Sequence, residues 1–133
     1  FHTGYNLEAI AIYRDLTGDD IFDSYIKKGF DYYINNFFKL DGTPKYYNNK
    51  TYPIDMHCCG QLFNTLSRLG ESDKFQKLSS AVLRWTVNNM QDKKGFFYYQ
   101  YGKFFVSKIS YIRWNNAFMF HALTNLILSK TDD

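Results

Sequence analysis

The stretch that decides the fold reads Tyr52-Pro53-Ile54-Asp55-Met56-His57-Cys58-Cys59-Gly60-Gln61. It follows a polar, turn-rich segment and opens an apolar run with helical spacing. Pro53 fixes a helical φ where no amide donor is needed, and a carboxylate at Asp55 in the first turn suits the helix dipole. We therefore predict a buried helix over about 54–69. Asp55, His57 and Gln61 would lie towards its start, on the wall of a ligand cleft.

Further helices are predicted on both sides of this stretch. Residues 5–17 place apolar side chains on one face, and Gly18 follows them as a C-terminal cap. Residues 20–37 and 71–90 are amphipathic, with one face in solvent. Residues 113–129 are apolar almost all round, which is typical of a helix enclosed by its neighbours. Short aromatic runs predict a β-hairpin near residues 96–106.

Landmarks in the two halves of the chain recur at a nearly constant spacing. Gly18 and Gly70 are 52 residues apart, and Gly42 and Gly95 are 53 apart. A pair of tyrosines follows each of the latter two, Tyr46-Tyr47 and Tyr98-Tyr99. Such a repeat predicts stacked α-hairpins, each with an apolar inner helix and an amphipathic outer helix. We therefore predict one all-α domain over residues 1–133, with its inner helices starting at the same end.

Composition excludes two classes of partner. The chain has 133 residues and a net charge of +3, and its 16 Lys and Arg residues form no continuous run. Dedicated binding of nucleic acid is therefore not expected. No stretch is long and apolar enough to span a bilayer. Aromatic residues make up 20% of the chain, which predicts ring-lined surfaces as well as a core.

The two cysteines, Cys58 and Cys59, are adjacent. A disulfide between neighbours is strained and fits poorly into a helical turn, so we predict two reduced thiols in the core. That prediction favours the cytoplasm, with the periplasm as the alternative. The chain begins at Phe1, without Met and without a leader, so we expect either that a signal was removed or, more simply, that the chain is a piece of a longer protein.

The common start of the inner helices gathers polar residues at one end. Asp55 and His57 are the candidate catalytic groups, because a carboxyl group and an imidazole can each exchange a proton with a substrate. Arg113 beside Trp114 would suit an anionic sugar, the guanidinium holding the anion and the indole stacking on the ring. The candidate ligand-binding residues are His2, Tyr5, Asn6, Gln61, Tyr98, Tyr99, Arg113, Trp114 and Asn115.

Each of these residues also has a structural interpretation. Asp55 can simply cap its helix, His57 can be a packed or surface histidine, and Arg113 can brace the preceding hairpin. His121 lies mid-helix among apolar residues, so we predict that it is a satisfied core histidine. No Cys/His spacing resembles a zinc site and no Gly-rich loop follows a strand, so neither a metal nor another cofactor is expected.

Four segments carry a resemblance to a known superfamily. They are Phe1-His2-Thr3-Gly4-Tyr5, Tyr52-Pro53-Ile54-Asp55-Met56-His57, residues 88–99 and Tyr111-Ile112-Arg113-Trp114. Together they resemble the six-hairpin (α/α) toroid superfamily, which includes glycosidases, unsaturated-uronyl hydrolases, sugar epimerases and polysaccharide lyases. The closest likeness is to bacterial members encoded with surface-polysaccharide biosynthesis genes. The resemblance spans the whole chain, which would be the last two and a half hairpins of a toroid.

The resemblance implies a function in carbohydrate metabolism. The domain would process an acidic polysaccharide or its precursor, as a glycoside hydrolase, a lyase or an epimerase-like enzyme. The alternative is a non-catalytic carbohydrate-binding or scaffold module, because fold does not fix function. An open arc of hairpins would leave the terminal helices, about 5–17 and 113–129, without a lateral neighbour. We therefore expect either self-association through these helices or cover from a longer chain.

Overall fold

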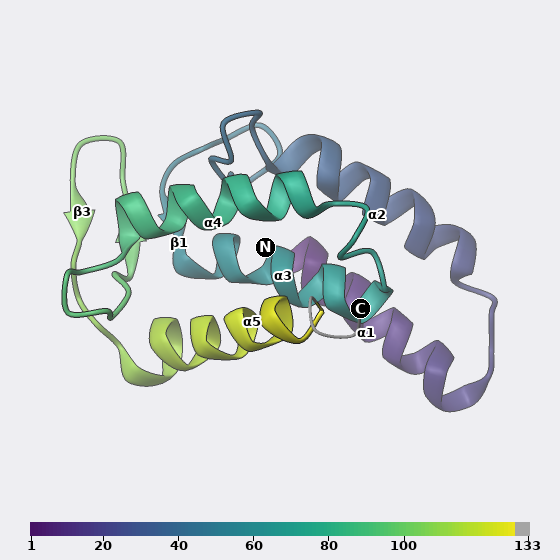
Figure 1. Cartoon of the computed structure of the whole chain (residues 1–133). Coiled ribbons are helices and arrows are strands. Elements are labelled where there is room, and N and C mark those ends of the chain that lie inside the picture. The colour runs from purple at the N-terminus through teal and green to yellow at the C-terminus, as the bar shows by residue number, and fades with distance from the viewer. Residues whose placement is uncertain (130–133) are drawn as a thin grey trace.

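The computed structural model describes residues 1–129 and is a mostly helical domain (Figure 1). In that range, its elements are the helices α1 (His2–Thr17), α2 (Asp23–Phe37), α3 (Met56–Leu69), α4 (Gln76–Met90) and α5 (Ala117–Leu128), the strands β1 (Ile54–Asp55), β2 (Gln100–Tyr101) and β3 (Val106–Ser107), and the π-helical turn η1 (Ile112–Asn116). The prediction of a helical domain is therefore confirmed, with a small antiparallel sheet of order β1-β2-β3 added to it.

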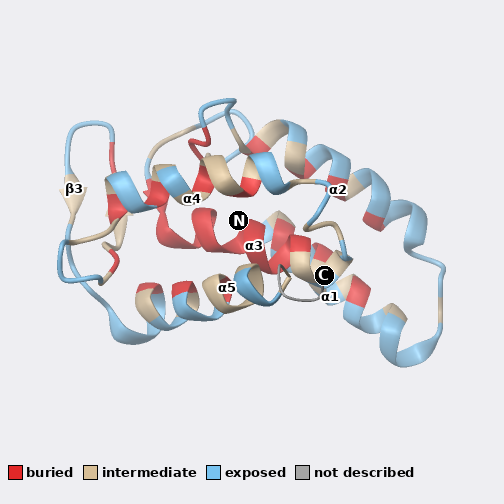
Figure 2. Cartoon of the chain, viewed as in Figure 1, coloured by how far each residue is buried: buried red, intermediate tan, exposed pale blue. Residues whose placement is uncertain are grey.

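Helix α3 is the centre of the domain. Helices α1, α4 and α5 pack against it, and α2 packs against α1. Residues 56–66 are all buried, and Figure 2 shows this helix as the most continuously buried element. Glycines allow its neighbours to come close, since a Cβ at Gly60 would lie 2.9 Å from the Met119 Sδ and one at Gly4 would lie 2.6 Å from the Gln61 Cγ.

The start of α3 differs from the prediction. The helix begins at Met56, Asp55 is its N-cap, and Pro53 lies outside it after a cis peptide bond. The sheet is the reason, because Ile54 and Asp55 pair with Tyr101 and Gln100 of β2 and are therefore extended. The helical position expected for Pro53 is wrong. Asp55 acts one residue before the first turn, as a cap.

The predicted repeat is confirmed in the turns after α2 and α4. Matching backbone bonds of 2.8–2.9 Å run from Lys45 N to Phe37 O and from Gly42 N to Lys39 O in the first turn, and from Tyr98 N to Met90 O and from Gly95 N to Asp92 O in the second. Gly42 and Gly95 both have positive φ, 86° and 95°. The offset is 53 residues throughout, so Tyr46 corresponds to Tyr99. The sequence comparison, which aligned Tyr46 with Tyr98, was wrong by one residue.

The hairpin lies further along the chain than predicted. Its strands are Gln100–Tyr101 and Val106–Ser107, and β1 joins them as a third strand. Residues 91–98 are not available for a strand pair because they form the repeated turn, with a bridge between Gln91 and Phe97. Phe104 at the tip is 88% exposed, so the aromatic run that suggested the hairpin marks its turn.

The last helix is not enclosed, contrary to the prediction. In α5 only Met119 and Ala122 are buried, while Phe120 and Ile127 are 75% and 62% exposed. The helix packs on α3 on one side, and its other side has no neighbouring helix within residues 1–129. In that part of the chain, no helix combines the length and the apolar character needed to cross a membrane.

We expect the isolated chain to self-associate through this outer face of α5. Phe120 and Ile127 are seven positions apart and therefore share a face of the helix, and exposed apolar patches of this kind are typical of interfaces. Sedimentation should show a monomer–dimer equilibrium that Phe120→Glu shifts to monomer. The matched control is Phe104→Glu, at the hairpin tip, which should leave the equilibrium unchanged. A chain that stays monomeric at all concentrations would contradict this prediction.

Candidate functional site

Asp55 and His57 form a buried pair at the start of α3. The Asp55 Oδ1 accepts a hydrogen bond from the His57 backbone N at 3.0 Å, and it lies 2.8 Å from the His57 Nδ1. The two residues are only 3% and 6% exposed. One carboxylate oxygen thus both caps the helix and fixes the imidazole. The capping interpretation of Asp55 is confirmed, and the carboxylate is placed to position His57 rather than to touch a ligand.

The other ring nitrogen of His57 is free. Within residues 1–129 it has no hydrogen-bond partner. In this range, two polar side-chain atoms are both completely enclosed and without a hydrogen-bond partner, the Tyr33 Oη and the Gln61 Oε1. The Nε2 is therefore not enclosed, and it reaches the surface. With Nδ1–H donating to Asp55, Nε2 carries the lone pair and can accept a proton.

Aromatic rings surround this imidazole. Its ring centroid lies 4.2 Å from Phe118, 4.7 Å from Trp114 and 5.4 Å from Phe1. These three rings come from the starts of α5, η1 and α1, so the inner helices do bring their first turns together around His57. A polar atom in a ring-lined surface is the arrangement that a ligand with both apolar and polar faces requires.

Arg113 and Trp114 extend the surface on one side. With Tyr111 and two other residues they line an open depression of about 600 Å³. Arg113 is exposed and has no acidic partner in the described part of the chain, while Trp114 is 50% exposed. The π-helical turn that presents them is an arrangement often found at functional sites. A free guanidinium beside an exposed indole can hold an anionic ring.

A smaller pocket adjoins Phe1, the ring at the start of α1 that lies close to His57. It has a volume of about 150 Å³ and is lined by Phe1, His2, Thr3, Phe37, Tyr46 and Tyr47. Phe1 links it to the histidine, since its ring lies 5.9 Å from Tyr46 as well as close to His57. His2 is therefore at this end of the molecule, as its position at the start of an inner helix predicts.

Two tyrosines of the predicted set lie close to Asp55. The pKa of Tyr5 is raised to about 12 by burial and by the charges of Glu8 and Asp55. The pKa of Tyr99 is raised by burial and by Asp55, and its ring lies 5.4 Å from Tyr111. Both phenols hold their protons at neutral pH, so each is a hydrogen-bond donor.

Other predicted residues are engaged elsewhere. Gln61 is fully buried and donates to Glu8 and Thr65, one turn below the pair. Asn115 is fully buried, and its Nδ2 donates to the Phe97 and Ile109 carbonyls.

Two further residues of the predicted set lie at the surface. Tyr98 donates to Asp92, with Lys108 over its ring. Asn6 is exposed on α1.

His121 does not lie in the core, so that prediction is wrong. The side chain is exposed on α5, and its Nε2 is 3.3 Å from the Asn125 Nδ2. Sequence reasoning also missed Phe1 and Phe118 as neighbours of His57. Phe118 stands in a run of apolar residues, so nothing in the sequence separates a ring at the site from a ring in the core.

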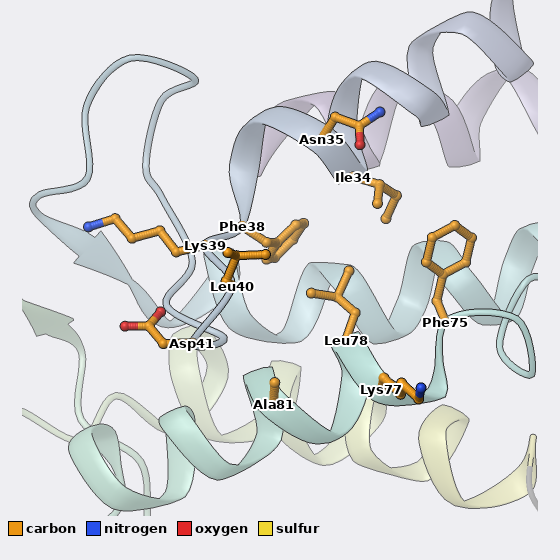
Figure 3. Close-up of a pocket in the computed structure, with 10 residues that line it drawn as sticks. All are labelled: Ile34, Asn35, Phe38, Lys39, Leu40, Asp41, Phe75, Lys77, Leu78 and Ala81. Atoms are coloured by element: carbon orange, nitrogen blue, oxygen red, sulfur yellow. The ribbon is translucent and has the colours of Figure 1, made fainter.

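A larger hollow among the described residues lies away from this group. It is a groove of about 930 Å³ between α2 and α4, drawn in Figure 3. Apolar side chains such as Phe38, Leu78 and Phe75 form its walls, and Lys39 extends away from it. The groove is mainly apolar, and its lining residues include neither a histidine nor an arginine, so it has less of the chemistry of a catalytic site than the His57 group. The His57 group is therefore the better candidate.

The cysteines confirm their prediction as reduced core residues. Both are free and buried, and burial raises the pKa of Cys58 to about 12 and that of Cys59 further still. Such thiols are inert, which removes them as nucleophiles. In residues 1–129 no group of His, Cys, Asp and Glu side chains is arranged to hold a metal ion.

Comparisons of the chain with protein-family models, with curated proteins and with solved structures find no match. The case for a function therefore rests on the residues around His57.

Proposed function

We propose that this domain binds an acidic carbohydrate at the His57 surface and transfers a proton there. The observation that carries the proposal is the His57 imidazole: Asp55 holds its Nδ1, its Nε2 has no partner within residues 1–129, and the rings of Phe1 and Trp114 lie 5.4 and 4.7 Å from it. We propose further that the domain is part of an (α/α) toroid. The side-by-side packing of α1, α3 and α5, with their starts at one end, supports that architecture.

The chemistry of the site favours some reactions over others. Hydrolysis of a glycoside uses two carboxyl groups, one on each side of the bond. Around His57 the described residues supply one, and it is buried behind the imidazole. Removal of the proton next to a uronate carboxylate needs one base and one cation, which His57 and Arg113 provide. Of the three expected activities, a lyase or an epimerase therefore fits better than a hydrolase.

In an elimination, the Nε2 takes the proton from the carbon next to the carboxylate. The electron pair of that C–H bond forms a carbon–carbon double bond. The bond to the glycosidic oxygen on the adjacent carbon breaks, and that oxygen leaves with a proton from a donor. Tyr5 is a neutral hydroxyl donor at this end of the molecule, because its pKa is raised to about 12.

A non-catalytic binding module is the second candidate. The observation in its favour is the single carboxylate, since stacking and ion pairing need only Trp114 and Arg113. The two candidates separate in a turnover assay on uronate oligosaccharides, where a lyase produces the ultraviolet absorbance of the unsaturated product and a binding module produces none.

Arg113→Ala should weaken binding of uronate oligosaccharides about ten- to hundredfold, because a hydrogen bond to a charged group contributes about 1.5–3 kcal/mol. Calorimetric titration with galacturonate, glucuronate and mannuronate oligomers measures the effect, and the neutral counterparts should bind more weakly to the parent chain. Arg84→Ala is the matched control, because Arg84 is exposed on the outer helix α4. Equal affinity of the parent chain and Arg113→Ala would refute the role of the guanidinium.

A further inference from the structure

A second polar pocket lies between α1, α3 and α5, beyond the rings that surround His57. It has a volume of about 320 Å³, and its lining residues all carry polar or charged side chains: Glu8, Asn64, Ser67, Arg68, His121 and Asn125. Glu8 follows Tyr5 by three residues, and His121 follows Phe118 by three. On α1 and α5 the pocket is thus about one helical turn further along than the aromatic site, and on α3 it begins at Asn64, seven residues and about two turns after His57. The two sites share no residue.

Hydrogen bonds hold the walls of the pocket in place. The Asn125 Nδ2 donates to the Asn64 Oδ1 at 3.0 Å and lies 3.3 Å from the His121 Nε2. On the opposite wall, the Glu8 Oε1 accepts from the Thr65 Oγ1 at 2.9 Å and from the Gln61 Nε2. These bonds connect all three helices, so the pocket is formed before any ligand arrives.

The same side chains keep unused polar atoms. Asn64 is only 5% exposed, yet its Nδ2 has no partner within residues 1–129 and is not enclosed. A buried carboxamide therefore directs a free donor into the pocket. The Glu8 Oε2 likewise has no hydrogen-bond partner within residues 1–129 and is not enclosed, so it is a free acceptor. The nearest carboxylate to Arg68 is Asp15, at 3.9 Å, which leaves most of its N–H groups available.

The pocket is lined by charges of both signs, a carboxylate at Glu8 and a guanidinium at Arg68. Burial raises the pKa of Glu8, while the bonds from Thr65 and Gln61 and the charges of Arg68 and His121 lower it. An anion in the pocket would meet the Glu8 carboxylate, and a cation would meet Arg68. A neutral ligand with several hydroxyl groups meets neither cost, because each hydroxyl both donates and accepts.

We infer that the pocket between α1, α3 and α5 binds the hydroxyl groups of a neutral sugar residue, with Glu8 as acceptor and Asn64 and Arg68 as donors. The volume is that of a small-ligand site. The inference goes beyond the proposed function, because it concerns other residues and an uncharged ligand. A negative result at the His57 site would not contradict it, and the reverse also holds.

The test is a titration of the isotope-labelled chain with glucose, galactose, mannose and N-acetylglucosamine, followed by NMR. At least one sugar should move the side-chain amide signals of Asn64 and Asn125, while the indole signal of Trp114 reports the His57 site separately. Glu8→Gln should weaken that sugar about tenfold, the effect of losing one charged hydrogen-bond partner. Arg68→Gln, at an exposed position that the fold does not depend on, should weaken it similarly.

The control is Glu71→Gln, the same change at a glutamate that pairs with Lys74 in the outer layer. It should leave the titration unchanged. The inference is overturned if none of the four sugars moves the Asn64 and Asn125 signals. It is also overturned if inorganic phosphate moves them in place of a sugar, or if the response survives both Glu8→Gln and Arg68→Gln.

Discussion

Replacing Gly42 with alanine is expected to cost about 4 kcal/mol of unfolding free energy, whereas the same change at Gly95 costs about 1 kcal/mol. The two glycines occupy equivalent turns, 53 residues apart, with φ of 86° and 95°. Each substitution places a side chain in the left-handed region, at a cost of about 1–2 kcal/mol. Only the surroundings differ.

At Gly42 the turn abuts helix α4. A Cβ there would lie 2.3 Å from the Ala81 carbonyl carbon and 2.4 Å from its oxygen. These are backbone atoms, so the clash is relieved only by moving the turn or the helix, which adds about 1–3 kcal/mol. At Gly95 no atom of residues 1–129 lies within 4 Å of the added carbon, apart from the glycine and its two chain neighbours. Urea unfolding of both variants measures the difference, provided that their m-values agree. Equal losses would show that the turn after α2 does not press against α4.

The helices of this domain were predictable because their signals are local. Leu7 and Ala11 are buried one turn apart on α1, and Gly18 and Gly70 follow helices that end in the left-handed region, with φ of 71° and 67°. Each signal depends on residues within a few positions of each other. The repeat was predictable for a related reason, since the same local turn chemistry occurs twice.

The site was only partly predictable, because side-chain surroundings depend on how the helices pack. Gln61 follows His57 by one turn and was expected beside it. The helix rise of about 6 Å over four residues moves it one layer deeper, where Gly4 of α1 closes over it. Asn115 follows Trp114 directly, yet the π-helical turn directs it inward to the Phe97 carbonyl. The spacing of polar residues in the sequence predicts neither position.

The strand β1 could not be predicted from the local sequence either. Ile54 and Asp55 precede a helix and carry no strand signal of their own. Their extended conformation comes from pairing with β2, where the partner of Asp55 is Gln100, 45 residues further along the chain. This long-range contact also sets the capping geometry of Asp55, and through it the position of the His57 ring. The hairpin thus helps to position the site.

The largest effect on function is expected at the pair itself. His57→Gln should lower turnover of the uronate substrate by about a hundred- to ten-thousandfold, the usual contribution of a positioned proton-transfer group. Affinity for the oligosaccharide should change little, because Trp114 and Arg113 remain. The control is Arg84→Gln, an exposed residue on the outer helix α4 that lies in neither proposed site, which should retain full turnover.

Asp55→Asn separates positioning from capping. Asparagine is as good an N-cap as aspartate, so the helix start and the stability should be kept. The variant loses the charge that holds Nδ1–H and leaves Nε2 as the acceptor, so kcat should fall while KM stays near its parent value. If Asp55 only caps the helix, Asp55→Asn should leave both the stability and kcat near their parent values. Full turnover in His57→Gln would contradict the assignment of His57 as the base. If the parent chain binds the oligosaccharide but does not turn it over, the domain is a binding module.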